Sequence, residues 1–325
     1  MKDSFLKNIL VNLRAFATVN IRKELNNKAK ALADLEVFAA NADYDFKQRF
    51  LFYSLISYFD ANPEEAKQYQ KEIAYFRQIN HISVFPYPSK IGTTTVDAGY
   101  DEGCGLPFVL HNQKKVFFPA SFTVDDAIFK YQYLICDERF LGEDDKYAPH
   151  QYQSSSVHIE NGDVLFDIGA AEGLFALDQI EKVSKAIIVE SDSEWIGPLR
   201  QTFKPFKDKV VIIQKFISVS DTENTMSLNT LLSMHDSPSM FVKMDIEGNE
   251  LPSITSAKEL LKTKEGIKLS IASYHKQHDY EELKTFFDYI GYHTESSNGY
   301  MFIQLYDMPT APFFRHGILR TKKLS

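Results

Sequence analysis

One seven-residue stretch, Asp167 to Gly173, constrains the fold of this chain more than any other. It follows an apolar run at residues 164–166 and precedes a helical pattern at residues 174–177, so the order is strand, tight glycine turn, helix. Gly169 lets the turn fold without a Cβ clash, and Gly173 lets a ligand or the next helix approach closely. Because a helix N-terminus offers unpaired backbone N–H groups, the stretch predicts a ligand-binding turn at the end of a strand.

The turn differs from a dinucleotide-binding loop at its first position. Such a loop reads G-x-G-x-x-G and places a pyrophosphate on the helix end. Asp167 stands where the first glycine would be, and a fixed anion at the strand end repels a pyrophosphate. A ligand that presents a cation and hydroxyls fits better, as the methionine ammonium and the ribose of S-adenosylmethionine do.

Four further apolar runs follow the turn, with polar side chains at their carboxyl ends. The runs are residues 186–189, 210–213, 240–244 and 268–272. Such runs are typical of a parallel sheet buried on both faces. Glu190, about twenty residues after the turn, can accept hydrogen bonds from both ribose hydroxyls. Ligands bind at this edge of such sheets, so Asp167, Glu190, Asp245 and His275 should converge on one crevice.

The end of the chain predicts an antiparallel addition to this sheet. A helix is expected from Asp279 to about Ile290, with Gly291 as its C-cap. Residues 293–296 and 300–305 then flank Asn298-Gly299, a strong hairpin signal. A parallel sheet finished by an antiparallel hairpin separates the methyltransferase form of this fold from most dehydrogenases.

Three motifs carry a family resemblance. They are Asp-Ile-Gly-Ala-Ala-Glu-Gly at 167–173, Val-Lys-Met-Asp-Ile-Glu-Gly-Asn-Glu at 242–250 and Tyr-His-Lys at 274–276. On these motifs, residues 145–323 resemble the FkbM family of S-adenosylmethionine-dependent methyltransferases. The resemblance implies an α/β class I methyltransferase fold, with a Rossmann-like parallel sheet. It also implies, most often, methylation of a hydroxyl on a sugar, a glycan or a secondary metabolite.

The length of 325 residues suggests more than one domain. We predict a helical region at residues 1–80, a mixed α/β connector at 81–154 and the methyltransferase domain at 155–325. Apolar residues between positions 5 and 16 share one helical face, with basic residues elsewhere. This helix could lie on a membrane surface, or pack against its own domain or a partner subunit in a homo-oligomer.

The connector carries two further expectations. Residues 106–110 and 116–118 flank five polar residues and predict a hairpin with a five-residue loop. Residues 124–140 read as a helix that leads to the following domain.

Composition excludes some functions. The net charge of −8 argues against nucleic-acid binding, which needs clustered Lys and Arg. Cys104 and Cys136 are expected to be a reduced pair rather than a disulfide. No apolar run reaches transmembrane length and the first residues lack a signal-peptide core, so we expect a cytoplasmic protein.

The expected cofactor contacts follow from the strand ends. Asp167 and Gly169 should lie near the methionine moiety, and Glu190 on the ribose. Phe216 and Ile217 should wall the adenine, although plain core packing would also explain them. The full predicted set is Asp167, Gly169, Ala171, Glu172, Gly173, Glu190, Ser191, Asp192, Phe216, Ile217 and Asp245.

Methyl transfer to a hydroxyl needs alignment and a base. His275 is the first candidate, since an ordinary imidazole titrates near neutrality. It could equally be a structural histidine in a loop. Asp245 is the alternative base, or the group that holds the methionine ammonium. Lys243, inside a buried strand, requires a charge partner, with Asp167, Asp245 and Glu250 as candidates.

The acceptor contacts are the least constrained. Residues 149–152 could fold over the crevice, or Tyr152 could simply pack on the sheet edge. Arg315 could bind an acidic substrate or solvate a tail. The predicted acceptor set is His150, Tyr152, Glu247, Tyr274 and Arg315.

Metal dependence and two rival functions stay open. Asp245, Glu247, His275 and His278 together raise the hypothesis of a Mg²⁺ site. A nicotinamide-dependent oxidoreductase on a related sheet is one rival, and the missing G-x-G-x-x-G counts against it. The other is a non-catalytic binding or assembly module, against which the intact cofactor residues count.

Overall fold

The computed structural model describes residues 44–141, 147–235, 237–304 and 309–323. The chain divides into two compact units, residues 1–66 with 76–82, and residues 67–75 with 83–325. The predicted amphipathic helix at residues 5–16 lies outside the described residues.

The described N-terminal segment is helical. A helix at residues 44–61 buries Leu51, Phe52, Leu55 and Phe59, which recur three or four residues apart. Pro63 then opens a helical stretch made of α3 (Pro63–Ala66), η1 (Lys67–Tyr69) and α4 (Gln70–Ile79). Proline suits the first turn because its missing N–H would have no partner there.

A small antiparallel sheet follows, made of β1 (Ala98–Asp101), β2 (Leu106–His111) and β3 (Lys114–Phe117). The predicted hairpin is confirmed, but its loop has two residues rather than five. His111 pairs with Lys114, and only Asn112 and Gln113 turn the chain, with φ of 47° and 66°. Two residues with positive φ match the twist of the paired strands, so the strands extend further than polarity indicated.

The predicted helix at 124–140 forms, with a change of pitch near its end. α5 (Val124–Gln132) begins with a capping box between Thr123 and Asp126. It continues as a π-helical turn, η2 (Tyr133–Glu138), and ends at Arg139 with φ of 53°. Such turns often mark functional sites, and this one places Glu138 beside the cavity described below.

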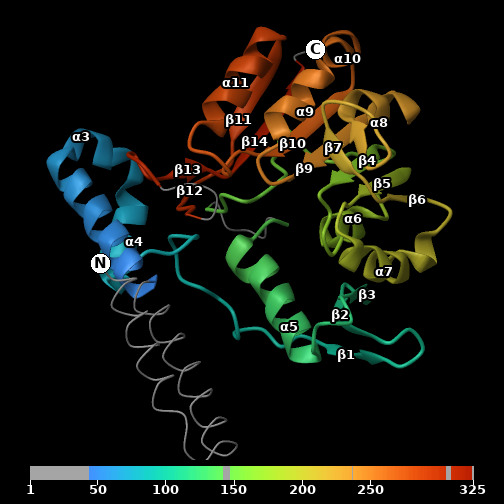
Figure 1. Cartoon of the computed structure of the whole chain (residues 1–325), viewed down its shortest axis with the longest axis horizontal. Coiled ribbons are helices and arrows are strands. Elements are labelled where there is room, and N and C mark those ends of the chain that lie inside the picture. The colour runs from blue at the N-terminus through green and yellow to red at the C-terminus, as the bar shows by residue number, and fades with distance from the viewer. Residues whose placement is uncertain (1–43, 142–146, 236, 305–308, 324–325) are drawn as a thin grey trace, which may run out of the picture. The chain divides into compact units, whose positions relative to one another are not determined.

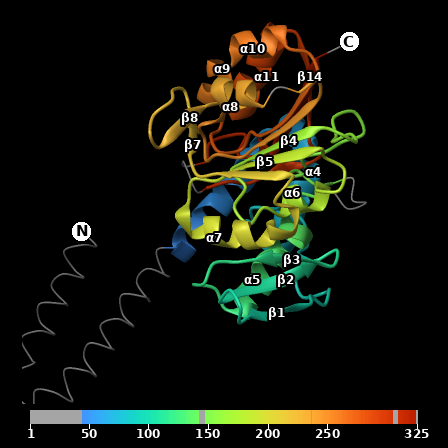
Figure 2. The same ribbon diagram turned by 90° about the vertical axis from the view of Figure 1, so that its right-hand side faces the viewer.

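The main sheet has seven strands in the order β11-β14-β10-β9-β4-β5-β6, with β14 antiparallel to both of its neighbours (Figures 1 and 2). This order, with an antiparallel strand inserted beside the fifth parallel one, is that of the class I methyltransferase fold. The predicted α/β fold class is therefore confirmed. The strands are β4 (Val164–Ile168), β5 (Lys185–Val189), β6 (Val210–Ile213), β9 (Met240–Met244), β10 (Ile267–Ala272), β11 (Tyr292–Ser296) and β14 (Ile318–Lys323).

Helices cover both faces of this sheet (Figure 1). One face carries α6 (Leu174–Gln179) and α7 (Ser193–Thr202), which is followed by η3 (Lys204–Phe206). The other carries α8 (Leu228–Met234), α9 (Glu250–Ser256), α10 (Lys258–Thr263) and α11 (Asp279–Tyr289). Gly291, with φ of 84°, follows α11 as predicted.

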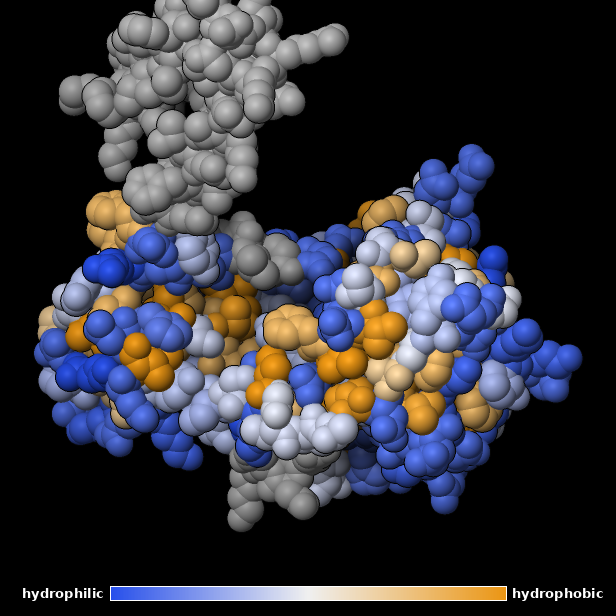
Figure 3. Space-filling model, turned by 90° about the horizontal axis from the view of Figure 1, so that it is seen from below, coloured by the Kyte–Doolittle hydropathy of each residue, from blue (hydrophilic) through white to orange (hydrophobic). Residues whose placement is uncertain are grey.

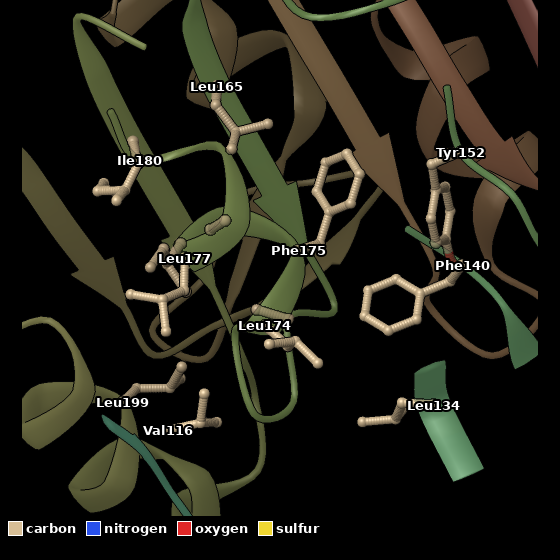
Figure 4. Close-up of a cluster of buried hydrophobic side chains, with 14 of the residues drawn as sticks. Val116, Leu134, Phe140, Tyr152, Leu165, Leu174, Phe175, Leu177, Ile180 and Leu199 are labelled. Atoms are coloured by element: carbon tan, nitrogen blue, oxygen red, sulfur yellow. The ribbon is translucent and has the colours of Figure 1, made fainter. Parts of the chain in front are cut away.

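Side chains alternate between two cores across the sheet. Leu165 and Phe241 belong to the core under α6, part of which Figure 4 shows. Phe166 and Val242, the next residues along each strand, belong to the core under α8 to α11. Successive side chains of a strand point to opposite faces of the sheet. Since both faces are buried, the strands are continuously apolar and do not alternate between polar and apolar residues.

The antiparallel end of the sheet is present, but its pairing differs from the prediction. β11 pairs with β14, which begins nineteen residues after Gly299, rather than with the run at 300–305. Tyr300 and Met301 form β12, which pairs with β13 (Arg315–His316). Gly299 does turn the chain, with φ of 92°. β14 lies between β10 and β11. A local turn signal cannot specify this pairing, because the paired strands are far apart in the sequence.

A short parallel pair, β7 (Phe216–Ser218) and β8 (Thr225–Ser227), lies outside the main sheet. Cys104 and Cys136 are both free thiols. The face in Figure 3 is mostly hydrophilic, with smaller hydrophobic patches. Among the described residues, no helix is both long enough and apolar enough to cross a bilayer.

Candidate functional site

A cavity of about 710 Å³ lies at the carboxyl ends of β4, β5 and β9. Two groups of residues line it, and we name them by their character. The turn end comprises Gly169, Ala171, Glu190, Ser191 and Asp192. The histidine end comprises Glu138, His150, Tyr152, Asp245 and Tyr274. Other lining residues are Lys130, Leu134, Phe140, Ile168, Ala170, Glu172, Phe175, Val189, Trp195, Lys215, Phe216, Ile217, Ser218, Thr225, Lys243, Ile246, Glu247 and Asn249.

The turn after β4 is tight because another strand end passes beside it. Gly169 has φ of 70°, and a Cβ there would lie 1.7 Å from the carbonyl oxygen of Asp245. Only glycine fits this position. Ala171 also has a positive φ of 45°. The turn therefore presents backbone to the cavity.

Glu190 holds this turn in place from the end of β5. Its Oε2 accepts a hydrogen bond from the Ala171 N–H at 2.7 Å, and its Oε1 accepts one from the Asp192 N–H at 2.8 Å. Each carboxylate oxygen has a second lone pair, so the group can still accept hydrogen bonds from a ligand. Asp192 also caps α7 by accepting from the Glu194 N–H.

Asp167 lies behind the cavity wall rather than in it. It is 1% exposed, and its Oδ1 is 3.1 Å from Lys243 Nζ, which also donates to the Gly169 carbonyl at 2.6 Å. Burial opposes the charge of Lys243, but Asp167 and Asp245 outweigh it and raise its pKa. Of the three predicted candidates, Asp167 forms the ion pair with Lys243. The predicted direct contact of Asp167 with a cofactor does not fit this geometry, because its carboxylate is enclosed.

Gly173 also serves packing rather than the cavity. A Cβ at this position would lie 2.7 Å from a Leu199 methyl and 2.8 Å from the Phe203 ring. Of the two alternatives for Gly173, close approach of a helix is the one that the structure contains.

Of the two residues predicted to wall the adenine, Phe216 is open to a ligand, whereas Ile217 is mainly a core residue. Phe216 is 61% exposed and lines the cavity, so its ring is available to a ligand. Ile217 is 4% exposed and belongs to the core under α8 while also reaching the cavity. Trp195 lines the same region and packs against Phe118 and Phe122.

Asp245 is the centre of the histidine end. Its Oδ2 accepts hydrogen bonds from the hydroxyls of Tyr152 at 2.8 Å and Tyr274 at 3.0 Å. His150 Nε2 lies 3.4 Å from Oδ2, and His275 Nε2 lies 3.2 Å from Oδ1. Burial would raise the pKa of Asp245, but His150 and His275 hold it well below the usual range. Asp245 is therefore an anion with several donors around it.

Each histidine has a glutamate on its other nitrogen. His150 Nδ1 lies 2.8 Å from Glu138, and His275 Nδ1 lies 3.1 Å from Glu250. Burial opposes the charge of both rings. Glu138 and Asp245 nevertheless raise the pKa of His150 to about 9, and Asp245 with Glu250 raises that of His275 to about 10.

The raised pKa and the position of His275 favour the structural alternative over the predicted role as the base. Asp245 and Glu250 raise the pKa of His275 and favour the protonated ring, which does not suit a group that has to accept a proton near neutrality. His275 is also 1% exposed and is not among the described residues that line the cavity. Its geometry fits the structural alternative, because it fixes Asp245 from behind.

Four of the five predicted acceptor residues line the cavity, and one does not. His150, Tyr152, Glu247 and Tyr274 line the cavity, Glu247 at an exposed position with φ of 59°. Arg315 does not. It is 3% exposed and donates to the carbonyls of Tyr274 and His275, both at 2.8 Å. Arg315 therefore holds the loop after β10 rather than an acidic substrate.

Donor atoms of Asp245, Glu250 and His275 lie within 4.8 Å of one another, close enough for a metal ion. Glu250 takes the place that the prediction gave to Glu247 and His278. However, the imidazole already contacts both carboxylates, and Glu250 Oε1 also accepts from the Ile246 N–H at 2.8 Å. A metal ion would have to displace these contacts.

Sequence reasoning missed Glu138 and underused Glu250. Glu250 is part of the Lys-x-Asp-x-Glu-Gly-x-Glu motif, so its spacing already carried the signal. Glu138 lies in another part of the chain, more than a hundred residues before Asp245, and nothing in its local sequence points to the site.

No family model matches the chain, and no curated protein matches it either. Similar solved structures include methyltransferase FkbM from Methylobacillus flagellatus KT, at 19% identity and a TM-score of 0.39. That match covers 52% of this chain and 46% of the other, so this chain spans about half of the FkbM protein. The fold assignment itself rests on the strand order.

Two further similar structures are a precorrin-6y C5,15-methyltransferase from Geobacter metallireducens GS-15 and an rRNA methylase from Streptococcus thermophilus. The first has 17% identity, a TM-score of 0.35 and coverage of 51% of this chain and 81% of the other. The second has 13% identity, a TM-score of 0.34 and coverage of 51% and 90%.

Proposed function

We propose that this protein is an S-adenosylmethionine-dependent methyltransferase that acts on a hydroxyl of a sugar, a glycan or a secondary metabolite. One observation carries the proposal. A sheet with the class I strand order brings the glycine turn after β4 and Glu190 after β5 to one cavity. This is the edge at which α/β folds of this kind bind ligands.

The residues present suit that cofactor. Gly169 exposes backbone because no Cβ fits there, and Glu190 can accept hydrogen bonds from ribose hydroxyls. Phe216 and Ile217 offer an apolar wall for adenine. Drug-sized ligands occupy cavities of roughly 300–1,000 Å³, and the cavity of about 710 Å³ falls within that range.

When bound, the sulfonium cofactor supplies an electrophilic methyl group whose leaving group is a neutral thioether. The protein has to orient the acceptor and receive its proton. We assign this role to Asp245, and the assignment is supported by its being an anion that lines the cavity. A weak base is sufficient when the hydroxyl becomes acidic as its oxygen bonds to the methyl carbon.

Two alternatives are weaker on specific grounds. A nicotinamide-dependent oxidoreductase needs a glycine pattern for a pyrophosphate, which this chain lacks at the turn after β4. The antiparallel β14 also counts against this alternative. A non-catalytic binding module would not require the buried, charged cluster around Asp245, because burying charged groups costs free energy. Cytoplasmic residence and assembly through the N-terminal helices stay parts of this proposal.

Calorimetric titration with S-adenosylmethionine, S-adenosylhomocysteine and NAD tests the cofactor. We expect saturable binding of the first two and none of NAD. Phe216→Ala should weaken binding about tenfold through the loss of ring contact with adenine. Phe129→Ala is a matched control, because Phe129 is 59% exposed and is not among the residues that line the cavity. Absence of binding to both sulfur ligands would overturn the proposal.

A further inference from the structure

Five side chains form one alternating row through the histidine end. The order is Glu138, His150, Asp245, His275 and Glu250, with each imidazole between two carboxylates. The four successive separations are 2.8, 3.4, 3.2 and 3.1 Å. Asp245 is at the centre, so both of its oxygens face a ring nitrogen.

The two arms of this row differ in what surrounds them. The side chain of Glu250 is 3% exposed and is tied to the Ile246 N–H, so the His275 arm is enclosed. The side chain of Glu138 is 15% exposed, and Glu138 and His150 both line the cavity. Glu138 comes from the π-helical turn η2, whereas Asp245 follows β9. The Glu138 arm is therefore the one that a bound acceptor would meet.

We propose that Glu138, acting through His150, is the positioning residue for the acceptor. It keeps the His150 ring protonated and directed at Asp245, which stays an anion oriented toward the acceptor hydroxyl. The inference rests on the proposed function, since it assigns the histidine end to the acceptor. An uncharged hydroxyl compound suits this end, because Glu138 and Asp245 would repel a group with its own negative charge.

The groups that face His150 explain why Glu138 matters. They are Glu138, Asp245, the hydroxyl of Tyr152 at 3.1 Å and the Tyr274 ring, which is nearly perpendicular to the imidazole. Burial lowers the pKa of His150, and the carboxylates act against it. Glu138 is the closer carboxylate, at 2.8 Å against 3.4 Å for Asp245, so its removal should lower the pKa of His150.

NMR titration of ring-labelled histidines tests the inference without an acceptor. In the native protein, His150 should titrate near pH 9. Glu138→Gln keeps the shape but removes the charge, and should lower the midpoint by at least about one pH unit. Glu138→Asp should restore part of this shift. Glu247→Gln is the matched control, since Glu247 lines the cavity but contacts His275 rather than His150, and should leave the midpoint unchanged.

An unchanged midpoint in Glu138→Gln, or a native midpoint at the ordinary value, would overturn the inference. If Glu138→Gln does not fold, the Glu138→Asp midpoint decides, because a loosened ion pair must still lower it. S-adenosylhomocysteine binding is measured on the same samples by calorimetry. If the native protein does not bind S-adenosylhomocysteine, the proposed function is refuted. The role of Glu138 is decided separately, by the titration.

Discussion

The two ends of the cavity are built in different ways. At the turn end, Glu190 receives two backbone N–H groups from residues within twenty positions of it. At the histidine end, Asp245 receives side chains from residues 150–152 and 274–275, about thirty to ninety-five positions away. One end is local and made of backbone, and the other is long-range and made of side chains.

This difference teaches which part of the site can vary. A backbone turn offers the same groups whatever its side chains are, provided that the glycine remains. A side-chain cluster changes with each substitution and is where acceptor specificity can be set. Gly169 joins the two ends, because its missing Cβ leaves room for the Asp245 carbonyl.

The largest effect should come from breaking that junction. Gly169→Ala places a Cβ 1.7 Å from a carbonyl oxygen at φ of 70°, so backbone must move at both ends. We expect a loss of about 4 kcal/mol in the free energy of unfolding, measured by chemical denaturation. Gly197→Ala is the control, since its Cβ would meet nothing within 4 Å. Equal stability of the two variants would show that the ends are not joined here.

The ion pair under the turn end should come next. Asp167→Asn leaves Lys243 buried without its closest carboxylate partner, and should cost about 3 kcal/mol, since the charge of Asp245 remains. Asp288→Asn breaks the exposed pair with Lys284 on α11 and should leave stability nearly unchanged. Denaturant midpoints of both variants test this. A small effect of Asp167→Asn would mean that Asp245 alone can hold Lys243.

Alkaline pH should weaken the histidine end more than the turn end, because His150 and His275 both contact Asp245 there. His150 and His275 hold protons in the folded state to about pH 9 and 10, but release them near 6.5 when unfolded. Their contribution is complete below pH 6.5 and disappears as pH rises toward 10. The slope for each proton is at most about 1.4 kcal/mol per pH unit.

Denaturation at pH 6, 8 and 10 measures this slope. His275→Gln should flatten it, since one of the two linked protons is then absent. A native free energy of unfolding that does not fall between pH 7 and 10 would contradict the pairing at the histidine end.

The smallest effect concerns metal. Because His275 already contacts Asp245 and Glu250, we expect EDTA to change the melting temperature and S-adenosylhomocysteine binding by no more than measurement error. Calorimetry before and after chelation measures both. A clear destabilisation that Mg²⁺ reverses would instead assign an ion to this cluster.

Much of the turn end was predictable because its signals are local. Gly169 and Glu190 could be placed from the spacing of a glycine turn and the next strand end. The packing role of Gly173 could not be separated from a ligand role, since the deciding neighbours are Leu199 in α7 and Phe203 just after it.

The histidine end was predictable only in part. His150, Tyr152, Asp245 and Tyr274 do meet at the cavity, as their positions before β4 and after β9 and β10 indicated. The enclosure of His275 and the buried role of Arg315 were not predictable, because burial depends on elements that pack from elsewhere.

The sequence by itself determined the strands, the glycine turn and the polar strand ends, since apolar runs and turn residues act over a few positions. Tertiary structure decided that β14 rather than the run at 300–305 pairs with β11. It also decided that Glu138 reaches His150 and that His275 lies between two carboxylates. Those outcomes depend on burial and on charges brought together from distant positions, and neither quantity exists until the chain has folded.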